Sequence, residues 1–563
     1  MSCRKNHRKG RELYMSTRRK FETDTIRKDN KLLSPLKTLV ETAFYKNDIT
    51  KVNSLEEAYH YARKSPTTII LDQIVENAEE LGLPKDAKVL VENGSSIVGR
   101  TARARRIYGK NPEEDEKLLK IAMDAIYEAN NYPLLEGEAI VGVDEEFMVR
   151  AHLLTPKAEA NNLYSWLLNF QVLNDEYKKR YEQSKEYEEN DIYIFSDPSW
   201  EHEDYPDGLS YIDSEHNVAI ILGLQYFGEL KKGTLTQAWG TAARQGYVSC
   251  HGGLKKFAKE NGDAHVTAFF GLSGSGKSTL THAKHDNKYD ITVLHDDAFI
   301  IDQETGSSIA LEPSYFDKTN DYPAGHPEQD YFVTVQNVGV TLNENNERVL
   351  VTEDIRNGNG RTVKSRYSTP NRVDMIEDPI NAIYWIMKDE TLPPILRVKD
   401  PTVAAAMGCT LVTKRSSAEN VENVGEVVVE PYANPFRVYP LVDDYHAFKK
   451  LFEEKDVECY IINTGKFMGK DIPPKVTLES IEHNVEEDAE FKPFGEIEAF
   501  EYLPIDGYDV SFEDEEYVKT MIKNMKTRID HLNTTLAEDE APNDLPEEIA
   551  QSIQNIVNLL EKK

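Results

Sequence analysis

Residues 265–282, HVTAFFGLSGSGKSTLTH, carry the motif that decides the expected fold. An apolar run leads into Gly271 to Ser278, which fits the pattern G-x-x-x-x-G-K-[ST] without a mismatch. Glycines let backbone N–H groups turn inward around phosphates, and a helix that starts there adds the positive end of its dipole. The stretch therefore predicts a buried strand, a phosphate-binding loop and the start of a helix.

Each residue type in this loop has an expected role in holding a nucleotide and its metal ion. Lys277 would contact the β- and γ-phosphates, and the Ser278 hydroxyl would bind Mg²⁺. The nucleotide-binding set that the motif predicts is Gly271, Ser273, Gly274, Ser275, Gly276, Lys277, Ser278 and Thr279. Further along, ITVLHDD (291–297) is an apolar run that ends in Asp296 and Asp297, and a carboxylate at such a strand end can hold a divalent cation.

The composition of the chain argues against some classes of function. Lysine and arginine total 66 and aspartate and glutamate total 98 among 563 residues, so the formal net charge is −32. A general nucleic-acid-binding protein would instead have a basic surface. There is no long apolar run, and the basic N-terminus lacks an apolar segment. We therefore expect neither a transmembrane helix nor a secretory signal.

The cysteines indicate the compartment. Four of them lie far apart, at positions 3, 250, 409 and 459, and none forms a CxxC pair. Such spacing does not suit a disulfide framework and is typical of a reducing environment. We therefore expect a cytoplasmic protein with no nucleic-acid or membrane partner.

Strand and helix patterns alternate along the chain, which predicts a mixed α/β fold. Helices are expected at 55–63, 71–81, 113–130 and 160–168, and strands at 138–144 and 146–154. A C-terminal helix is expected to pack on the body through an apolar face formed by Ile549, Ile553, Ile556 and Leu560. Residues 217–233, NVAIILGLQYFGELKKG, are expected to form a buried strand followed by a turn that carries two lysines.

Two further segments do not belong to an ordinary phosphate-loop kinase. One is Tyr226-Phe-Gly-Glu-Leu-Lys-Lys-Gly233, and the other is Ser249-Cys-His-Gly-Gly253, which precedes the loop strand. Adjacent lysines are usually solvated and a single histidine is usually structural, so each segment alone has an ordinary explanation. Together with the loop and the aspartate pair, in this order, they resemble ATP-dependent phosphoenolpyruvate carboxykinase.

The resemblance extends over residues 90–485, and its specific part is the block 220–320. The family's Tyr-x-Gly-Glu-x-Lys-Lys-Gly segment, its histidine before the kinase strand, its phosphate loop and its paired aspartates all have counterparts here. Further counterparts are Gly99-Arg100, Glu312 to Thr319, Arg366 in KSRYSTPN, Leu392-Pro-Pro and Tyr460 to Gly465.

The resemblance implies a two-lobed α/β fold with the active site in the cleft between the lobes. Residues 1–35 would be a loosely attached, disordered arm. Residues 36–245 would form the substrate-side lobe, and residues 246–563 would form the nucleotide-binding lobe with the phosphate loop.

The resemblance also implies a reaction and its metal ions. Oxaloacetate and ATP would give phosphoenolpyruvate, CO₂ and ADP, reversibly, as a carboxy-lyase of gluconeogenesis. Lys232, His251 and Asp297 would bind Mn²⁺, while Ser278 would hold Mg²⁺ with the nucleotide. A lysine ligand must be neutral, so its pKa must be lowered, and the positive charge of Lys231 next to it would contribute to this.

The remaining expected roles concern the substrate and the nucleotide. Arg100 and Arg366 would clamp the substrate carboxylates, because a guanidinium forms paired hydrogen bonds with a carboxylate. The substrate set is Arg100, Tyr226, Lys231 and Arg366, and the catalytic set is Arg100, Lys231, Lys232, Lys277 and Arg366. On the nucleotide side, the resemblance adds Lys318, Glu328 and Thr477.

Departures from the family pattern keep two alternatives open. Ala298-Phe-Ile300 follows the aspartates where the family has Glu-His-Gly, and Asp471 stands where the family has an arginine near adenine. One alternative is another phosphate-loop phosphotransferase of related fold, which would leave His251 and Arg366 without a role. The other is a nucleotide-binding regulator without turnover. The sequence does not decide between ATP and GTP or give the direction of the reaction. It also leaves the oligomeric state open, either a monomer or a small homo-oligomer.

Overall fold

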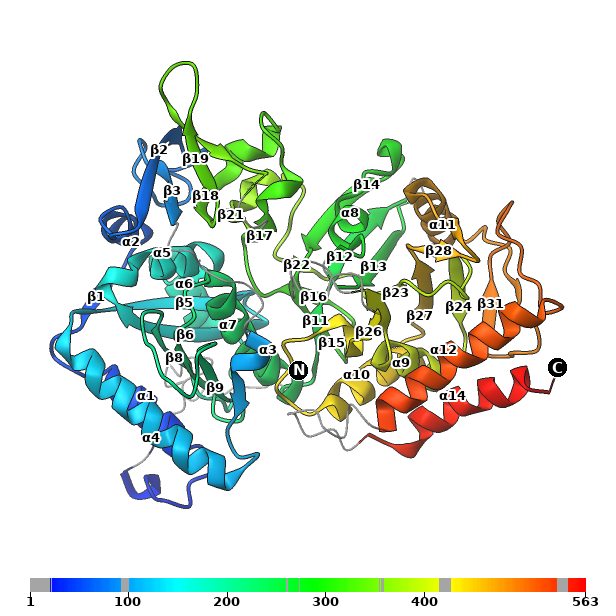
Figure 1. Cartoon of the computed structure of the whole chain (residues 1–563), viewed down its shortest axis with the longest axis horizontal. Helices are drawn as coiled ribbons and strands as arrows, with labels where there is room; N and C mark the ends of the chain where they lie inside the picture. Colours follow the sequence, from blue (N-terminus) through cyan, green and yellow to red (C-terminus); the bar gives the residue numbers. More distant parts are fainter. Residues whose placement is uncertain are drawn as a thin grey trace, which may run out of the picture.

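The computed structural model describes residues 21, 23–92, 101–259, 262–272, 274–353, 355, 359–414, 427–533 and 545–562. Its strands form two eight-stranded sheets, a five-stranded sheet, a four-stranded sheet and three two-stranded sheets. The two large sheets lie on opposite sides of the molecule (Figure 1). In the described part of the chain, no helix combines the length and the apolar character that crossing a membrane requires.

The first large sheet is built from strands of the N-terminal part. In spatial order they are β1 (Thr50–Val52), β5 (Leu134–Asp144), β6 (Phe147–Pro156), β8 (Ile192–Asp197), β10 (Val218–Leu222), β9 (Leu209–Asp213) and β4 (Arg105–Ile107), with β7 (Gln171–Val172) paired to β5. Helices α1 (Pro35–Ala43) and α4 (Pro112–Glu128) cover one face. Helices α5 (Ala160–Asn169) and α7 (Phe227–Arg244) cover the other, and α2 (Leu55–Ala62) packs on α5.

The five-stranded sheet joins distant segments of the chain. Its spatial order is β17 (Tyr315–Lys318), β21 (Arg361–Lys364), β18 (Phe332–Gln336), β3 (Lys88–Glu92) and β2 (Thr68–Ile74). β3 and β18 are parallel neighbours, with Leu90 opposite Thr334. Residues 315–364 therefore share a sheet with residues 68–92.

The second large sheet contains the strand that precedes the glycine-rich loop. In order its strands are β14 (Asp290–His295), β12 (Gly253–Ala258), β13 (Ala264–Phe270), β23 (Ala382–Met387), β27 (Glu458–Asn463), β24 (Ile395–Val398), β31 (Phe500–Tyr502) and β30 (Lys492–Pro493). β13 pairs in parallel with β23, which pairs in parallel with β27. The carboxyl ends of these three strands therefore meet at one edge, where α/β proteins place their ligands.

The other elements complete the described chain. The four-stranded sheet comprises β11 (Tyr247–His251), β15 (Ala298–Asp302), β16 (Ser308–Ala310) and β22 (Met375–Ile376). The remaining α-helices are α3 (Thr101–Ala104), α6 (Asp175–Gln183), α8 (Lys277–His282), α9 (Pro401–Cys409), α10 (Leu441–Glu454), α11 (Pro474–Glu486), α12 (Glu515–Asn533) and α14 (Glu547–Leu560). The short pairs are β19 (Gly339–Leu342) with β20 (Arg348–Val351), β25 (Val412–Lys414) with β26 (Val427–Val429), and β28 (Lys466–Phe467) with β29 (Lys470–Asp471).

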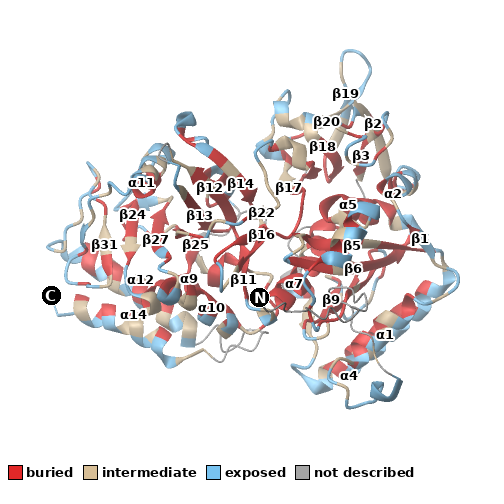
Figure 2. Cartoon of the chain, turned by 180° about the vertical axis from the view of Figure 1, so that it is seen from behind, coloured by how far each residue is buried: buried red, intermediate tan, exposed pale blue. Residues whose placement is uncertain are grey.

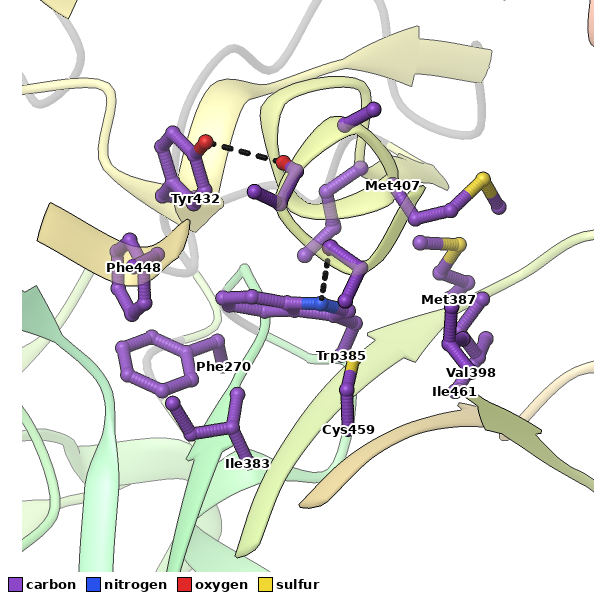
Figure 3. Close-up of a cluster of buried hydrophobic side chains, with 14 of the residues drawn as sticks. Phe270, Ile383, Trp385, Met387, Val398, Met407, Tyr432, Phe448, Cys459 and Ile461 are labelled. Carbon is purple, nitrogen blue, oxygen red and sulfur yellow. Dashed lines mark hydrogen bonds between the residues drawn. The ribbon is translucent and has the colours of Figure 1, made fainter. Parts of the chain in front are cut away.

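An aromatic core holds the second large sheet against α9 and α10. Trp385 on β23 packs against Phe270, Phe448 and Tyr432, and all four rings are buried (Figure 3). The Trp385 indole N–H donates to the Ala404 carbonyl at 3.1 Å, so the polar atom of this ring is satisfied inside the core. Figure 2 shows that the inner strands of both large sheets are buried, while the outer faces of the covering helices are exposed. This core fixes the end of β13, from which the loop departs.

Several sequence-based predictions are confirmed by the structure. Helices occupy 55–62, 112–128 and 160–169, and strands occupy 134–144 and 147–156. The C-terminal helix α14 buries its predicted apolar positions, Ile549, Ile553, Ile556 and Leu560. Residues 1–20 and 22 of the expected N-terminal arm lie outside the described residues, and α1 begins at the end of that arm, at Pro35.

Two predictions of local structure are wrong. The expected helix at 71–81 is instead β2 followed by turns, because Ile69, Ile70 and Ile74 pair with β3 and tertiary pairing outweighs the helical pattern. The two lysines expected in a turn lie in helix α7, which begins at Phe227. The Phe227 N–H donates to the Gln336 side chain at 2.9 Å, so a distant strand caps this helix.

Candidate active site

The Asp297 carboxylate is the centre of a buried cluster of basic side chains. Lys231 Nζ donates to Asp297 Oδ2 at 2.5 Å, and Lys232 Nζ donates to the same oxygen at 2.8 Å. His251 Nε2 lies 2.9 Å and Lys277 Nζ lies 3.6 Å from Asp297 Oδ1. The basic residues come from α7, β11 and α8, and Asp297 lies between β14 and β15 (Ala298–Asp302), so the fold gathers three segments around a carboxylate on a fourth.

The two adjacent lysines have different surroundings. Consecutive helical positions point about 100° apart, so Lys231 and Lys232 approach Asp297 from different sides. Lys231 is fully buried and also lies 2.9 Å from Glu312 Oε1. Lys232 lies over the Phe436 ring, with Nζ 4.6 Å from the ring centroid.

This difference separates the pKa values of the two lysines. Burial would lower the pKa of Lys231, but Asp297 and Glu312 outweigh burial and raise it above its usual range. Burial lowers the pKa of Lys232 to about 8, because attraction by Asp297 does not offset burial and repulsion by Lys231. Lys231 therefore stays protonated at neutral pH, whereas Lys232 is close to giving up its proton.

His251 presents an unprotonated nitrogen to the carboxylate. Burial, together with the charges of Lys277 and Lys232, lowers the pKa of His251 to about 4, so the ring is neutral. Its Nδ1 lies 2.5 Å from the Ala433 carbonyl and must donate to it, which leaves a lone pair on Nε2. Two acceptors, Nε2 and Asp297 Oδ1, then face each other at 2.9 Å, an arrangement that a shared cation stabilises.

Asp297 itself stays ionised. Burial alone would raise the pKa of its carboxyl, but the three lysines hold that pKa well below its usual range. The site therefore offers an ionised oxygen donor, a neutral imidazole and an easily deprotonated amine within a few ångströms. This donor set fits a divalent ion of intermediate softness, such as Mn²⁺.

Two buried residues that we did not predict as site residues support this cluster. His295 Nε2 donates to the Ser314 carbonyl at 3.0 Å, and its Nδ1 accepts from the Asp297 backbone N–H at 3.1 Å. Glu312 accepts from the Asn169 side chain at 2.5 Å and pairs with Lys231. The signal for His295 was its position directly before the aspartate pair. Glu312 is marked in the sequence only as the start of the segment Glu312 to Thr319.

The glycine-rich loop connects β13 to α8, as the motif predicts. Gly276 has a φ of 103°, which favours glycine. At Gly271 a Cβ atom would lie 2.3 Å from the Ser275 Oγ, so a larger residue would have to displace the Ser275 side chain. Thr464 Oγ1 donates to the Ser275 carbonyl at 2.9 Å and Lys388 Nζ donates to the Gly274 carbonyl at 3.1 Å. Side chains at the ends of β23 and β27 thus hold the loop backbone in place.

The far end of α8 is anchored by a buried lysine that sequence reasoning missed. Lys255 Nζ donates to the Leu280 carbonyl at 2.6 Å and the Ala283 carbonyl at 3.2 Å, and it lies 2.8 Å from His285 Nε2. At Gly253 a Cβ atom would lie 1.9 Å from Thr281 Oγ1, so β12 and α8 are in close contact. The available signal was Lys255 in the strand GLKKFA, two positions before Phe257.

The comparisons with known proteins agree with this site. The sequence model of the phosphoenolpyruvate carboxykinase family matches residues 96–503. The chain belongs to the phosphoenolpyruvate carboxykinase family. The match includes every residue of the Asp297 cluster and the whole glycine-rich loop.

Individual members of the phosphoenolpyruvate carboxykinase family are distant in sequence. The chain is 26% identical to phosphoenolpyruvate carboxykinase (ATP) of Aeropyrum pernix over 306 residues, which are 51% of this chain and 60% of the relative. It is 28% identical to the Staphylococcus haemolyticus enzyme of the same name over 46% of this chain and 48% of the relative. It is 36% identical to that of Dictyostelium discoideum over 18% of each chain. The chain thus matches about half the length of the first two relatives and less of the third.

The other predicted phosphoenolpyruvate carboxykinase positions are placed as follows. Arg100 and Ser273 lie outside the described residues. Arg366 donates to Asp374 at 2.6 Å, and Arg372 donates to the same oxygen at 2.5 Å. Asp296 turns toward His282, 3.4 Å away, so the structure separates the two aspartates into different surroundings.

The predicted nucleotide-side and substrate residues are distributed around these elements. Ser278 and Thr279 are exposed in the first turn of α8. Glu328 accepts from Lys364 at 2.6 Å, and Lys318 ends β17. Thr477 is buried in α11. Tyr226 is buried beside Phe316, with ring centroids 5.9 Å apart.

Proposed function

We propose that this chain is an ATP-dependent phosphoenolpyruvate carboxykinase, converting oxaloacetate and ATP reversibly into phosphoenolpyruvate, CO₂ and ADP. The observation that carries the proposal is the meeting of Lys231, Lys232 and His251 with Lys277 at the Asp297 carboxylate. A phosphotransferase needs the loop lysine and a carboxylate but has no use for a neutral histidine and a pair of adjacent lysines beside them. Relatives with this activity in their names match about half of the chain.

The proposal includes a two-lobed arrangement with the site in the cleft. Residues 36–245 would form the substrate-side lobe and residues 246–563 the phosphate-loop lobe. The cluster would lie between the two parts, because Lys231 and Lys232 come from the first part while His251, Lys277 and Asp297 come from the second. The five-stranded sheet also joins the two parts, since it pairs β18 with β3. The arm would join the first lobe at its end, where the Leu32 carbonyl accepts from the Asn190 side chain at 3.3 Å.

Lys232, His251 and Asp297 would hold Mn²⁺, and the Ser278 hydroxyl would hold the Mg²⁺ that accompanies ATP. A bound divalent cation would stabilise the negative charge that decarboxylation builds on the enolate oxygen. Two features of the site favour binding of this cation: His251 is neutral, and the pKa of Lys232 is near 8. The Asp297 carboxylate would exchange part of its pairing with the lysines for the metal.

The other residues would position and neutralise the reactants. Lys231 remains protonated between Asp297 and Glu312 and would place a fixed positive charge beside the enolate and the transferred phosphoryl group. Lys277 would contact the β- and γ-phosphates in the cradle formed by Gly271 to Thr279. Lys318, Glu328 and Thr477 would lie on the nucleotide side.

Substrate binding would use the arginines. Arg366 and Arg100 would clamp the two carboxylates of oxaloacetate, with Tyr226 and Lys231 beside them. Arg366 would then exchange its hydrogen bond with Asp374 for the substrate. The burial of Lys231 and His251 keeps water away, and exclusion of water prevents protonation of the enolate to pyruvate.

The setting of the reaction is part of the same proposal. The enzyme would act in the cytoplasm on small molecules, as a monomer or small homo-oligomer, without a nucleic-acid or membrane partner. Its physiological role would be gluconeogenesis.

The test is the reverse reaction with purified protein. Phosphoenolpyruvate, bicarbonate, Mn²⁺ and Mg²⁺ are incubated with ADP or GDP in parallel, and oxaloacetate is followed with malate dehydrogenase. We expect turnover with ADP that is lost in Lys232→Ala and His251→Ala and kept in His60→Ala, whose side chain is half exposed on α2. Turnover with GDP alone would overturn the nucleotide assignment. Binding of ATP without any oxaloacetate would favour another phosphotransferase or a regulator.

A further inference from the structure

A second cluster of charged side chains lies on the first large sheet, away from the glycine-rich loop. Glu136 and Glu138 lie on β5, and His152 lies directly opposite Glu138 on β6. All three project from the face that α1 and α4 cover, since the His152 ring packs edge-on against Phe44 at the end of α1. None of these residues takes part in the proposed carboxykinase reaction.

His152 points an unpartnered nitrogen at both carboxylates. Its Nδ1 lies 3.7 Å from Glu136 Oε1 and 3.7 Å from Glu138 Oε1. These separations are longer than a hydrogen bond, and Nδ1 has no hydrogen-bond partner. The His152 side chain is only 7% exposed, so water does not readily satisfy this atom.

The surroundings of the ring define which nitrogen is available. His152 Nε2 lies 3.2 Å from Asp191 Oδ2 and donates its proton to that carboxylate. Tyr193 stacks on the ring with centroids 4.5 Å apart, which fixes its plane. A carboxylate behind one imidazole nitrogen, with the other nitrogen facing outward, is the arrangement that orients histidine ligands of metal ions.

In each of the two glutamates, one carboxylate oxygen faces His152 and the other faces a basic side chain. The Oε2 atom of Glu136 lies 3.4 Å from Lys51 Nζ, and the Oε2 atom of Glu138 accepts from Arg150 at 2.5 Å. The Oε1 atoms are the ones that face His152.

We propose that Glu136, Glu138 and His152 form a binding site for a divalent transition-metal ion of the zinc class. The three donor atoms lie within 4.8 Å of one another. Ligands of a tetrahedral zinc ion at about 2.0–2.2 Å are separated by roughly 3.4 Å, so the 3.7 Å separations need to shrink by only a few tenths of an ångström. One imidazole with two carboxylates suits Zn²⁺, Co²⁺ or Mn²⁺ better than Ca²⁺.

The site also has an entry path. The Glu138 side chain is 25% exposed, whereas that of Glu136 is 4% exposed, so an ion would arrive past Glu138. Water from the same side would complete the coordination. The ion would tie β5 to β6 near the covering helix α1, which gives it a structural role in this half of the molecule.

Metal counting on the full chain tests the proposal. The protein is stripped with a chelator, titrated with Zn²⁺ and with Co²⁺, and analysed for bound metal and for the visible absorption of Co²⁺. We expect His152→Asn to bind one equivalent fewer than the wild type and to lose the absorption bands of one Co²⁺ ion. The control His60→Asn, on α2 in the same half of the chain, should match the wild type.

A second variant, Glu138→Gln, keeps the test decisive if His152→Asn fails to fold. The Glu138 side chain is partly exposed, and glutamine has nearly the same shape as glutamate. The Glu138→Gln protein should therefore fold, and it should also bind one equivalent of metal fewer than the wild type. Zn²⁺ should raise the thermal midpoint of the wild type by more than that of Glu138→Gln. Equal metal content in the wild type and both variants would overturn the site and leave a protonated His152 among its carboxylates. Because the test counts metal, its result is independent of whether oxaloacetate is formed.

Discussion

The two ends of α8 hold buried lysines in opposite ways. At its start, Lys277 turns toward Asp297, where Lys231 and Lys232 also meet a carboxylate. At its end, Lys255 is bound by two backbone carbonyls and lies beside a neutral histidine. Burial lowers the pKa of Lys255 to about 7, because only the more distant Glu482 opposes it.

The comparison of the two ends of α8 shows what keeps a buried lysine charged. A carboxylate in direct contact offsets desolvation, while carbonyl groups alone do not. The start of α8 is therefore positively charged and suited to phosphates, whereas its end is an anchor in which the lysine is easily neutral. Lys232 stands between these cases, since it shares Asp297 with another lysine and has a pKa of about 8.

The largest expected effect comes from removing the shared carboxylate. Asp297→Asn should lower turnover at least about a hundredfold, since it removes a proposed metal ligand and the group that orients three lysines. It should also lower the free energy of unfolding by about 3–5 kcal/mol, because it leaves buried positive charge unpaired. Chemical denaturation and the oxaloacetate assay measure the two effects.

The control for this variant is Asp378→Asn, which removes a half-exposed partner of Lys256. It should leave turnover unchanged. An Asp297→Asn protein with stability equal to that of the control would show that the lysines do not need their carboxylate.

The pH dependence of Mn²⁺ binding should report Lys232. The metal must displace the proton from the amine, so apparent affinity should rise about tenfold per pH unit below pH 8 and level off above it. His251, with a pKa of about 4, is neutral throughout this range. Titrations with Mn²⁺ from pH 6 to pH 9 provide the measurement. A profile that is the same in Lys232→Ala and the wild type would assign the dependence to another group.

At the other end of α8, Lys255→Met should change how stability depends on pH. The ordinary pKa of 10.5 applies in the unfolded chain and about 7 in the folded chain, so the unfolded state binds more protons between these values. This group therefore makes the folded state more stable as pH rises from about 7 to 10.5, on the order of 1 kcal/mol per pH unit.

Lys255→Met should remove that slope, as measured by denaturation at pH 7 and at pH 9.5. Lys256→Met is the matched control, because its neighbouring side chain pairs with Asp378 and is more exposed. A slope in Lys255→Met equal to that of the control would mean that Lys255 stays charged in the fold.

The smallest effect is expected at the surface. Lys450 pairs with Glu304 at 2.6 Å, and both side chains meet solvent. Lys450→Ala should change the free energy of unfolding by no more than about 0.5 kcal/mol, since water already stabilises both charges. Thermal or chemical denaturation measures it. A loss as large as that of Asp297→Asn would contradict the distinction between buried and exposed pairs.

Much of the candidate site could be predicted because its residues lie in short motifs. The loop from Gly271 to Ser278 is contiguous, and its flanking strand and helix follow from local patterns. His251 and Asp297 also stand next to this region in sequence. The family match from 96 to 503 agrees with the family that these motifs indicated.

The supporting residues could not be found in this way. Glu312 contacts Lys231 across 81 positions, and Asn169 contacts Glu312 across 143. No local sequence pattern identifies such residues, because the role of a glutamate or an asparagine depends on the group that it contacts in the fold. The helix expected at 71–81 failed for the same reason, because β3 supplied a pairing partner.

The sequence by itself determined the glycine-rich loop, the apolar strands and the family, since these depend on residues that are neighbours along the chain. The tertiary structure alone decided the ionisation of Lys231 and Lys232, the pairing of Arg366 with Asp374 and the orientation of His152 between Asp191 and two glutamates. Electrostatic free energy depends on distance in space and on exclusion of water, and only the packed fold sets these two quantities.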